Sequence, residues 1–236
     1  MKKIIALTLT ALTAIAAFAK PFVPGKTAVV TITANDTITW FGEDDEEHGS
    51  GLLNLAVRKD ITENASKEEQ IQAGYTAYMM EDVKAAVFEV LAEKGLDLIP
   101  EETVLASNAY TAASDNKFLL AGFRNKPEGY KLLATNEKKL YPLLISELGA
   151  DNIVLISFNI QKNMNTGVSH TGNMKACVTV TIQFLDAKGK MAKSFSGYGS
   201  ASEAIPVVKG VYDPQALAEQ YPEALRAAVR KALEKL

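Results

Sequence analysis

The sequence is poor in the residues that most often build catalytic and metal centres. It has one cysteine, two histidines and one tryptophan among 236 residues. A single cysteine excludes an intrachain disulfide, so a packed core must provide the stability. The two histidines, His48 and His170, are far apart in sequence and do not form the histidine pair of a helical zinc motif. The sequence therefore argues against disulfide scaffolds and histidine-rich metal centres.

Clusters of positive charge are also absent. The chain has 25 Lys and Arg residues against 28 Asp and Glu residues, a formal net charge of −3. Removal of Lys2 and Lys3 with the leader described next gives −3 − 2 = −5. Proteins that bind nucleic acids or anionic membranes usually carry a cluster of basic residues on their surface, so we expect no nucleic-acid partner.

Long apolar runs are missing after the first nineteen residues. The letters MKK give a charged start, about 15 apolar residues follow, and AFA has the small-x-small form of signal peptidase sites. The run is short for a membrane span, which needs ~20 residues. We expect a signal peptide at 1–19 and no transmembrane span in the mature chain. No cysteine stands at the cleavage point, so we expect an unlipidated periplasmic or secreted protein.

After the leader, the composition is that of an ordinary soluble domain. Hydrophobic residues make up 47% and charged residues 22% of the chain, which is enough apolar material for a core. Residues 20–25, KPFVPG, form a short segment that leads into the domain. The sequence shows no repeat and no linker, so we expect one domain over residues 26–236.

Strand patterns stand out in several segments. Residues 26–33, KTAVVTIT, are rich in β-branched side chains and predict a first strand, with 37–41 as its hairpin partner. Residues 152–160, NIVLISFNI, are continuously apolar, as in a central strand covered on both faces. Residues 176–184 alternate strictly, which predicts a half-buried antiparallel strand. The letters DAKG after it predict a hairpin turn at Gly189.

The clearest helical pattern follows Ser66-Lys-Glu-Glu, which has the capping-box spacing. Apolar residues then recur every three or four positions and predict one long helix over residues 66–94 whose stripe packs on the sheet, with Gly74 as a candidate break in its first turns. Tyr75, Tyr78 and Met79 in this stripe could instead line a ligand cleft. Both interpretations stay open at the level of sequence.

The remaining elements complete the expected fold. Residues 96–102, LDLIPEE, predict a short strand, whereas residues 114–137 show no assignable pattern. Residues 137–148 predict a helix that Gly149 ends, and Asp213 followed by proline predicts the start of a C-terminal helix. The expected fold class is α/β, with α+β as the alternative. It would have a single mixed sheet with an antiparallel C-terminal hairpin and helices packed on it.

Two motifs within residues 147–190 carry a family resemblance. ELGAD and VLISF are followed by the hairpin pattern V-x-V-x-I-x-x-x-D-x-x-G-K. This part of the chain resembles the small α/β module of bacterial envelope proteins. That group includes the TolB amino-terminal domain, the penicillin-binding-protein activator LpoB and the curli secretion lipoprotein. The rest of the chain matches only in the order of elements, and two of these relatives carry a lipid-anchor cysteine that this chain lacks.

The resemblance implies a docking or assembly element instead of a catalyst. We therefore expect an exported, non-catalytic, envelope-associated interaction or assembly module whose partner is an envelope protein or polysaccharide. The alternative is a secreted small-ligand-binding protein or hydrolase with a cleft beside the 66–94 helix. The sequence indicates no cofactor and no particular oligomeric state.

The most unusual stretch is the acidic run that ends at His48. It lacks the alternating ligand spacing of a calcium loop, and consecutive carboxylates stay hydrated unless an ion holds them together. We expect a solvated surface loop and no metal site. Weak calcium binding is the alternative, and its candidate ligands are Glu43, Asp44, Asp45, Glu46 and Glu47.

The other reactive side chains do not form a catalytic motif. Ser169 and His170 are adjacent, and adjacency does not place them for triad chemistry. Cys177 lies in a predicted strand, as a small buried thiol would. No nucleophile elbow, Walker loop or dinucleotide fingerprint occurs in the sequence. The sequence favours a non-enzyme and leaves one class open, because a glycosidase carboxylate pair has no sequence signature.

A polar segment, residues 161–173, joins two predicted core strands. It is long for a hairpin connection, and loops of that length often carry binding residues, although a plain connector fits as well. We expect a partner-binding loop here. Its candidate contact residues are Asn163, Asn165, Ser169, His170 and Asn173.

Overall fold

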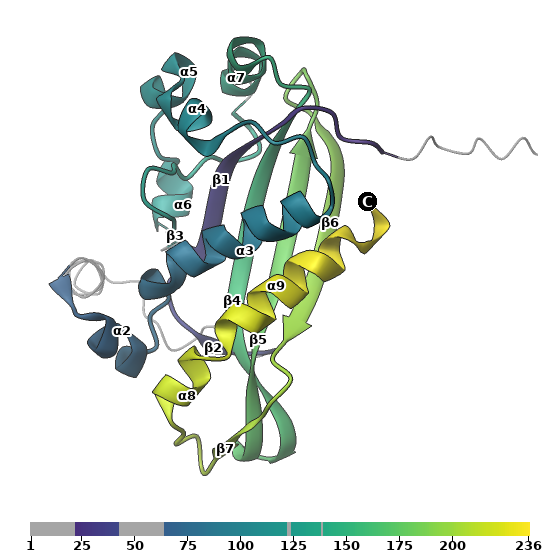
Figure 1. Cartoon of the computed structure of the whole chain (residues 1–236). Coiled ribbons are helices and arrows are strands. Elements are labelled where there is room, and N and C mark those ends of the chain that lie inside the picture. Colours follow the sequence, from purple (N-terminus) through teal and green to yellow (C-terminus); the bar gives the residue numbers. More distant parts are fainter. Residues whose placement is uncertain (1–21, 43–63, 122–123, 138) are drawn as a thin grey trace, which may run out of the picture.

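The computed structural model describes residues 22–42, 64–121, 124–137 and 139–236, which form one mixed sheet with helices on both faces (Figure 1). The strands are β1 Thr27–Asn35, β2 Thr39–Trp40, β3 Arg124–Asn125, β4 Asn152–Val168, β5 Thr171–Leu185, β6 Met191–Ser200 and β7 Ile205–Val207. The helices are α2 Lys67–Ala73, η1 Ala77–Met79, α3 Met80–Glu93, α4 Glu101–Ala106, α5 Asn108–Ala112, α6 Lys117–Ala121, α7 Leu140–Leu148, α8 Pro214–Ala218, α9 Tyr221–Ala232 and η2 Leu233–Lys235.

The sheet combines parallel and antiparallel pairing. Its main order is β3-β1-β4-β5-β6, and two short strands extend it, β2 beside β4 and β7 beside β5. β1 is parallel to β4, while β4, β5 and β6 form an antiparallel meander. The fold is the α/β mixed sheet that the sequence predicts.

Helices α3 and α9 cover one face of the sheet (Figure 1). The alternating apolar side chains of β5, from Ala176 to Phe184, point into this core and are fully buried. Val83, Val87 and Val90 of α3 meet them from the helix side. The strict alternation seen in the sequence therefore marks the face of β5 that packs on these helices.

Close contact between α9 and β6 depends on glycine. A Cβ atom at Gly197 would lie 2.2 Å from the Ala228 carbonyl oxygen, and one at Gly199 would lie 2.3 Å from the Ala228 nitrogen. Real Cβ atoms do not approach backbone atoms so closely, so only glycine lets the helix lie directly on the strand.

The opposite face of the sheet is covered only in part. Buried side chains of α4, α5 and α7 pack on Val30, Ile153 and Leu155 of β1 and β4. Farther along, the described helices leave polar side chains of β4 and β6 exposed. These exposed residues are Ser157, Asn159, Ser194, Ser196 and Tyr198.

Several helix boundaries follow the sequence prediction. The Ser66 hydroxyl accepts a hydrogen bond from the Glu69 N–H, and the Glu69 carboxylate accepts from the Ser66 N–H, which completes the capping box. Gly149 ends α7 in the left-handed conformation, with φ of 60°. Asp213 caps α8 by accepting from the Gln215 N–H at 2.9 Å.

The long helix predicted over residues 66–94 is divided at Gly74, the candidate break in its first turns. Helix α2 ends at Gly74, which has a left-handed φ of 72°, and the chain re-enters helical structure only at η1 and α3. The break is stabilised by bonds to the end of β1. The Thr76 N–H donates to the Asp36 carbonyl at 2.9 Å, and the Ile38 N–H donates to the Gly74 carbonyl at 2.7 Å.

The predicted hairpin between residues 26–33 and 37–41 is wrong, because β2 pairs in parallel with β4. The Asn35 side chain explains this path. Its amide donates to the Ile160 carbonyl at 2.9 Å and its oxygen accepts from the Ile160 N–H at 2.6 Å. One side chain thus replaces a backbone pair and directs the chain along β4.

The strand predicted at residues 96–102 is reduced to a single parallel bridge between Thr27 and Leu98. Pro100 follows, and Glu101 begins α4. Proline has no N–H for a ladder and is well tolerated where a helix begins, so the segment turns helical at this point.

Candidate functional site

The ends of β4 and β5 form an arm that extends beyond helix α8 (Figure 1). We define the arm as residues 161–176 together with residues 205–212. Its two long strands stay paired from Gln161 and Cys177 to Val168 and Thr171, with one irregularity after Met164. The expectation of a polar loop at 161–173 is therefore wrong, because the segment is a continuous hairpin.

A two-residue turn joins the two strands. Its residues, Ser169 and His170, have φ values of 49° and 55°. Positive φ at both central positions is the mark of a type I′ turn, which matches the twist of a hairpin. The connection is tight even though neither residue is glycine.

A second turn is bonded to the first. After β7 pairs with Gly172 to Met174, Lys209 and Gly210 form a turn with φ values of 50° and 81°. The Gly210 N–H donates to the His170 carbonyl at 2.9 Å, and the Lys209 N–H donates to the Thr171 hydroxyl at 2.9 Å. The two turns are thereby fixed to one another.

Backbone strain is concentrated in these two turns. Among the residues that the structure describes, the non-glycine residues with positive φ are Ser169, His170 and Lys209. Each costs about 1–2 kcal/mol relative to a right-handed conformation, and such conformations are often kept where a defined surface matters.

An aromatic stack holds the tip in place. The His170 ring stacks on the Trp40 ring with centroids 4.2 Å apart. The Lys162 ammonium lies 5.0 Å from the centroid of Trp40 and donates a 3.1 Å hydrogen bond to the Tyr212 hydroxyl. The turn thus contacts β2 through Trp40, and Lys162 of β4 links Trp40 to Tyr212, which follows β7 in the chain.

The tip presents valines to solvent. Val168, Val208 and Val211 flank the two turns and are 78%, 60% and 75% exposed. Single exposed apolar residues are ordinary, whereas three on two bonded turns form a small apolar surface. We call these three residues the valine tip.

The partner-binding candidates selected from sequence all lie in the arm, and they differ in exposure. Asn163 is half-buried and its side chain bonds with that of Tyr198. Asn165 is exposed at the irregularity of β4. Asn173 is exposed and donates to the Thr166 hydroxyl at 3.2 Å. Ser169 and His170 form the turn, as described above.

Sequence reasoning missed the valine tip. The only available signal was the pair Lys209-Gly210 between valines, which is typical of a turn but says nothing about exposure. The acidic candidates Glu43 to Glu47 lie outside the described residues. Within the ranges that the structure describes, no three His, Cys, Asp or Glu side chains group to hold a metal ion.

Cys177 is part of the sheet and not of a reactive centre. It is fully buried, and burial raises the pKa of its thiol to about 11, although a hydrogen bond with the Tyr198 side chain acts in the opposite direction. Thiols react as thiolates, so this cysteine is inert at neutral pH. Its role is packing.

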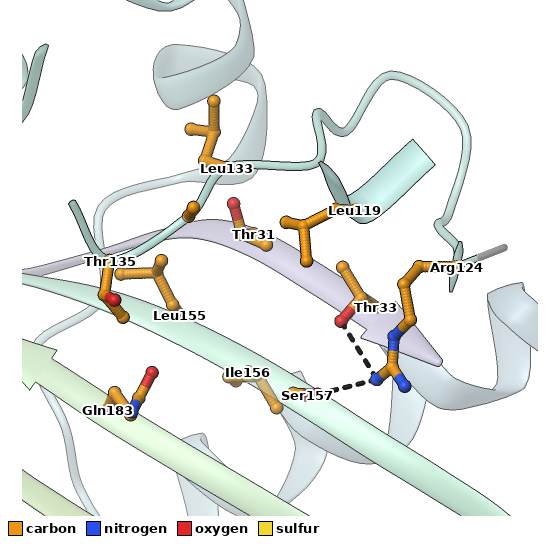
Figure 2. A pocket seen from close by; sticks show the side chains of 11 residues that line it. Thr31, Thr33, Leu119, Arg124, Leu133, Thr135, Leu155, Ile156, Ser157 and Gln183 are labelled. Carbon is orange, nitrogen blue, oxygen red and sulfur yellow. Dashed lines mark hydrogen bonds between the residues drawn. The ribbon is translucent and has the colours of Figure 1, made fainter. Parts of the chain in front are cut away.

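A cavity of about 390 Å³ lies on the partly covered face of the sheet (Figure 2). Its floor is formed by β1, β4 and β5, and its rim by α6 and residues 133–135. The Arg124 guanidinium lies at one end and donates to the Ser157 hydroxyl at 2.6 Å and to the Phe158 carbonyl at 2.8 Å. Burial lowers the pKa of Arg124.

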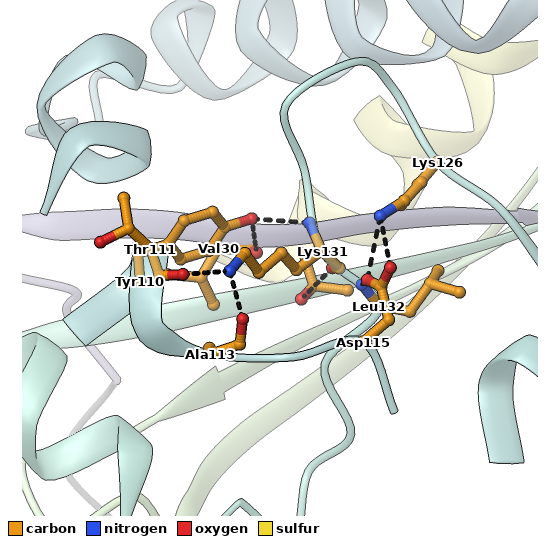
Figure 3. A network of polar contacts seen from close by, with 9 residues as sticks. Val30, Tyr110, Thr111, Ala113, Asp115, Lys126, Lys131 and Leu132 are labelled. Carbon is orange, nitrogen blue, oxygen red and sulfur yellow. Dashed lines mark hydrogen bonds and ion pairs between the residues drawn. The ribbon is translucent and has the colours of Figure 1, made fainter. Parts of the chain in front are cut away.

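A polar network lies beside this cavity, around residues 126–132 (Figure 3). The Tyr110 hydroxyl donates to the Val30 carbonyl at 3.0 Å and accepts from the Lys131 N–H at 2.8 Å. The Asp115 carboxylate pairs with Lys126 at 2.8 Å and accepts from the Leu132 N–H at 2.7 Å. These bonds hold residues 126–132 against β1 and α5, and residues 133–135 of the cavity rim follow directly in the chain.

The stripe of the 66–94 segment is occupied by core packing. Met79, Val83 and Val87 are at most 1% exposed, while Tyr75 and Tyr78 are half-buried. The stripe therefore packs on the sheet, which was the first of the two interpretations of its sequence. None of the helices in the described ranges is both long and apolar enough to span a bilayer.

Comparisons with known proteins give distant similarities only. No family model and no curated protein matches the chain. A lipoprotein of Neisseria meningitidis is 15% identical, with a TM-score of 0.31 over 83% of this chain and 92% of that one. A hypothetical protein of Chlamydia trachomatis is 13% identical, with a TM-score of 0.29 over 76% and 74% of the two chains.

A Helicobacter pylori protein described as a neuraminyllactose-binding hemagglutinin homologue is 11% identical, with a TM-score of 0.35 over 88% of this chain and 82% of that one. These three structures come from bacteria. At these TM-scores the similarity carries no argument about function, which has to come from the arm and the cavity themselves.

Proposed function

We propose that this protein is an exported, non-catalytic interaction module of the bacterial envelope that docks on a protein partner through the valine tip. The observation that carries the proposal is the arm itself. Its two turns keep three strained non-glycine residues and expose three valines. A tight connection between two strands needs positive φ in its turn, but it does not need exposed valines.

The rigidity of the arm supports recognition by a preformed surface. The hairpin register, the bonds between the two turns and the stack of His170 on Trp40 all restrict the tip before binding. A partner then gains contacts at little cost in ordering entropy. Apolar side chains at the end of a rigid projection suit a pocket on a protein better than a polysaccharide.

The sequence provides the cellular setting of this proposal. The leader at residues 1–19 directs export, and the motifs within residues 147–190 resemble the envelope docking modules of the TolB, LpoB and curli secretion group. The core packing of the 66–94 stripe favours this function over the alternative with a cleft beside that helix.

Site-specific photocrosslinking in envelope extracts of the bacterium that encodes the chain tests the proposal. A photoreactive residue at position 168 or 211 should capture one and the same partner. The same group at Leu143, which is 61% exposed on α7, is the control and should not capture it. Capture that is equal at all three positions, or different partners at 168 and 211, would contradict docking through the tip.

A further inference from the structure

The cavity beside Arg124 has the composition of a small-molecule site (Figure 2). Its volume of about 390 Å³ falls within the range of roughly 300–1,000 Å³ that is usual for ligand pockets. Leu119, Leu133 and Leu155 provide apolar walls, and a single cation lines one end. Apolar walls with one charged group are typical of a site that orients a small amphipathic ligand.

The cation is held in a fixed position. Nη2 of Arg124 donates to the Ser157 hydroxyl, to the Phe158 carbonyl and, at 3.4 Å, to the Thr33 hydroxyl. Figure 2 shows both hydroxyls next to the same guanidinium nitrogen, at the end of the cavity. A hydroxyl that accepts from a guanidinium still has its own hydrogen to donate. Two hydroxyl hydrogens and the charge of one guanidinium therefore meet at one end of the cavity.

The charge of the site fits a monoanion. The guanidinium is bonded to neutral oxygens, and the carboxylate that acts on its charge is Asp36. A phosphate dianion would bring two negative charges to one cation beside an existing carboxylate, whereas a carboxylate brings one.

We propose that this cavity binds a carboxylate carried by a small apolar group, such as an aliphatic or aromatic acid. The carboxylate pairs with Arg124 and accepts from the hydroxyls of Thr33 and Ser157, while the apolar group packs against Leu119, Leu133 and Leu155. The same chemistry is presented by a free acid and by the C-terminal residue of a peptide. The site is independent of the valine tip, so either proposal can fail without the other.

Calorimetric and NMR titrations of the full mature chain with hexanoate and benzoate test the site, with hexanamide and benzamide as neutral analogues. We expect binding of the acids and at least about tenfold weaker binding of the amides, because a hydrogen-bonded charge is lost. A short peptide that ends in leucine, compared with its C-terminal amide, tells whether the natural source is a peptide or a free acid. Equal binding of acids and amides, or no binding of any acid at millimolar concentration, would overturn the proposal.

Two variants separate the site from general stability. Arg124→Lys keeps the charge but loses the planar guanidinium that positions the hydroxyls of Thr33 and Ser157, and should weaken hexanoate binding roughly tenfold or more. Leu119→Trp, at a half-buried rim position, should fill the cavity and abolish binding in a folded protein. Arg226→Lys on α9 is the matched control and should bind as the wild type does. If Arg124→Lys does not fold, Leu119→Trp decides, and unchanged binding in that variant contradicts the site.

Discussion

The imidazole ring of His170 stacks on the indole ring of Trp40, with centroids 4.2 Å apart and planes inclined by 14°. His170 belongs to the hairpin turn of the arm. Trp40 belongs to β2 and pairs with Lys162 of β4. The contact fixes the turn against a strand that is well separated from it in sequence. It is the side-chain basis for regarding the arm as a preformed surface.

Trp40→Ala should therefore loosen the tip without unfolding the sheet. An aromatic pair contributes about 0.5–1.5 kcal/mol beyond its buried area, so amide hydrogens near His170 should exchange roughly two- to tenfold faster. Hydrogen exchange measured by mass spectrometry checks this. Trp40→Phe keeps a stacking ring and should restore most of the protection, and exchange that is unchanged in Trp40→Ala would show that the stack is dispensable.

Gly199→Ala should strongly destabilise the fold. The added Cβ would lie 2.3 Å from the Ala228 nitrogen and 2.4 Å from the Ala224 carbonyl oxygen, and backbone atoms cannot move aside cheaply. Overpacking of this kind costs at least about 1–3 kcal/mol, which corresponds to a melting temperature lower by roughly 2–12 °C. Calorimetry checks the value. Ser200→Ala, one residue away, should melt within about 1 °C of the wild type.

Part of the fold could be predicted because the signals are local. The alternation of residues 176–184 marks a buried face, and the termini at Ser66, Gly149 and Asp213 use side chains and glycine conformations that act within a few residues. Local patterns of this kind do not depend on how the rest of the chain folds, so they can be identified from the sequence alone. These predictions are confirmed.

The arm escaped prediction for a physical reason. Beyond Met164 the hairpin leaves the core until Met174, so most side chains of residues 165–173 are exposed and the alternation of a half-buried strand is lost. The Ser169-His170 turn lacks the Asn-Gly or Asp-Gly letters that usually indicate a type I′ turn. The cavity was equally hidden, because Thr33, Leu119, Arg124 and Ser157 come together only in the folded chain.

Cys177 should be protected from thiol reagents in the folded protein. With the pKa of its thiol raised to about 11, on the order of one thiol in a thousand is ionised at pH 8. Ellman's reagent should react slowly with the native protein and quickly after addition of guanidinium chloride. Rapid stoichiometric reaction of the native protein would contradict the buried position.

Ionisation of Glu147 should make the free energy of unfolding depend on pH. Its carboxylate accepts from the N–H groups of Ala109 at 2.8 Å and Asn108 at 2.6 Å, and these bonds lower its pKa below the ordinary 4.5. Because the pKa of Glu147 is lower in the folded state, its ionisation stabilises the fold at any pH above the pKa of the unfolded chain. This stabilisation disappears as the pH falls through the pKa of the folded state.

Glu147→Gln should accordingly lower the melting temperature at neutral pH, and the difference from the wild type should shrink steadily below about pH 4.5. Thermal unfolding followed by circular dichroism over this range checks it. Glu128→Gln, at an exposed carboxylate on the surface, is the control. A difference between Glu147→Gln and the wild type that stays constant down to about pH 2 would contradict the assigned cause.

Docking through the valine tip is tested most directly by the binding of purified protein to envelopes isolated from the bacterium that encodes it. Burial of each valine contributes roughly 1.5–3 kcal/mol, so Val168→Asp with Val211→Asp should weaken binding at least about tenfold. Leu143→Asp introduces one such charge at an exposed leucine of α7 and should bind as the wild type does, so each single valine variant is compared with it. Wild-type affinity in the folded double variant, or an equal loss in Leu143→Asp, would contradict the account.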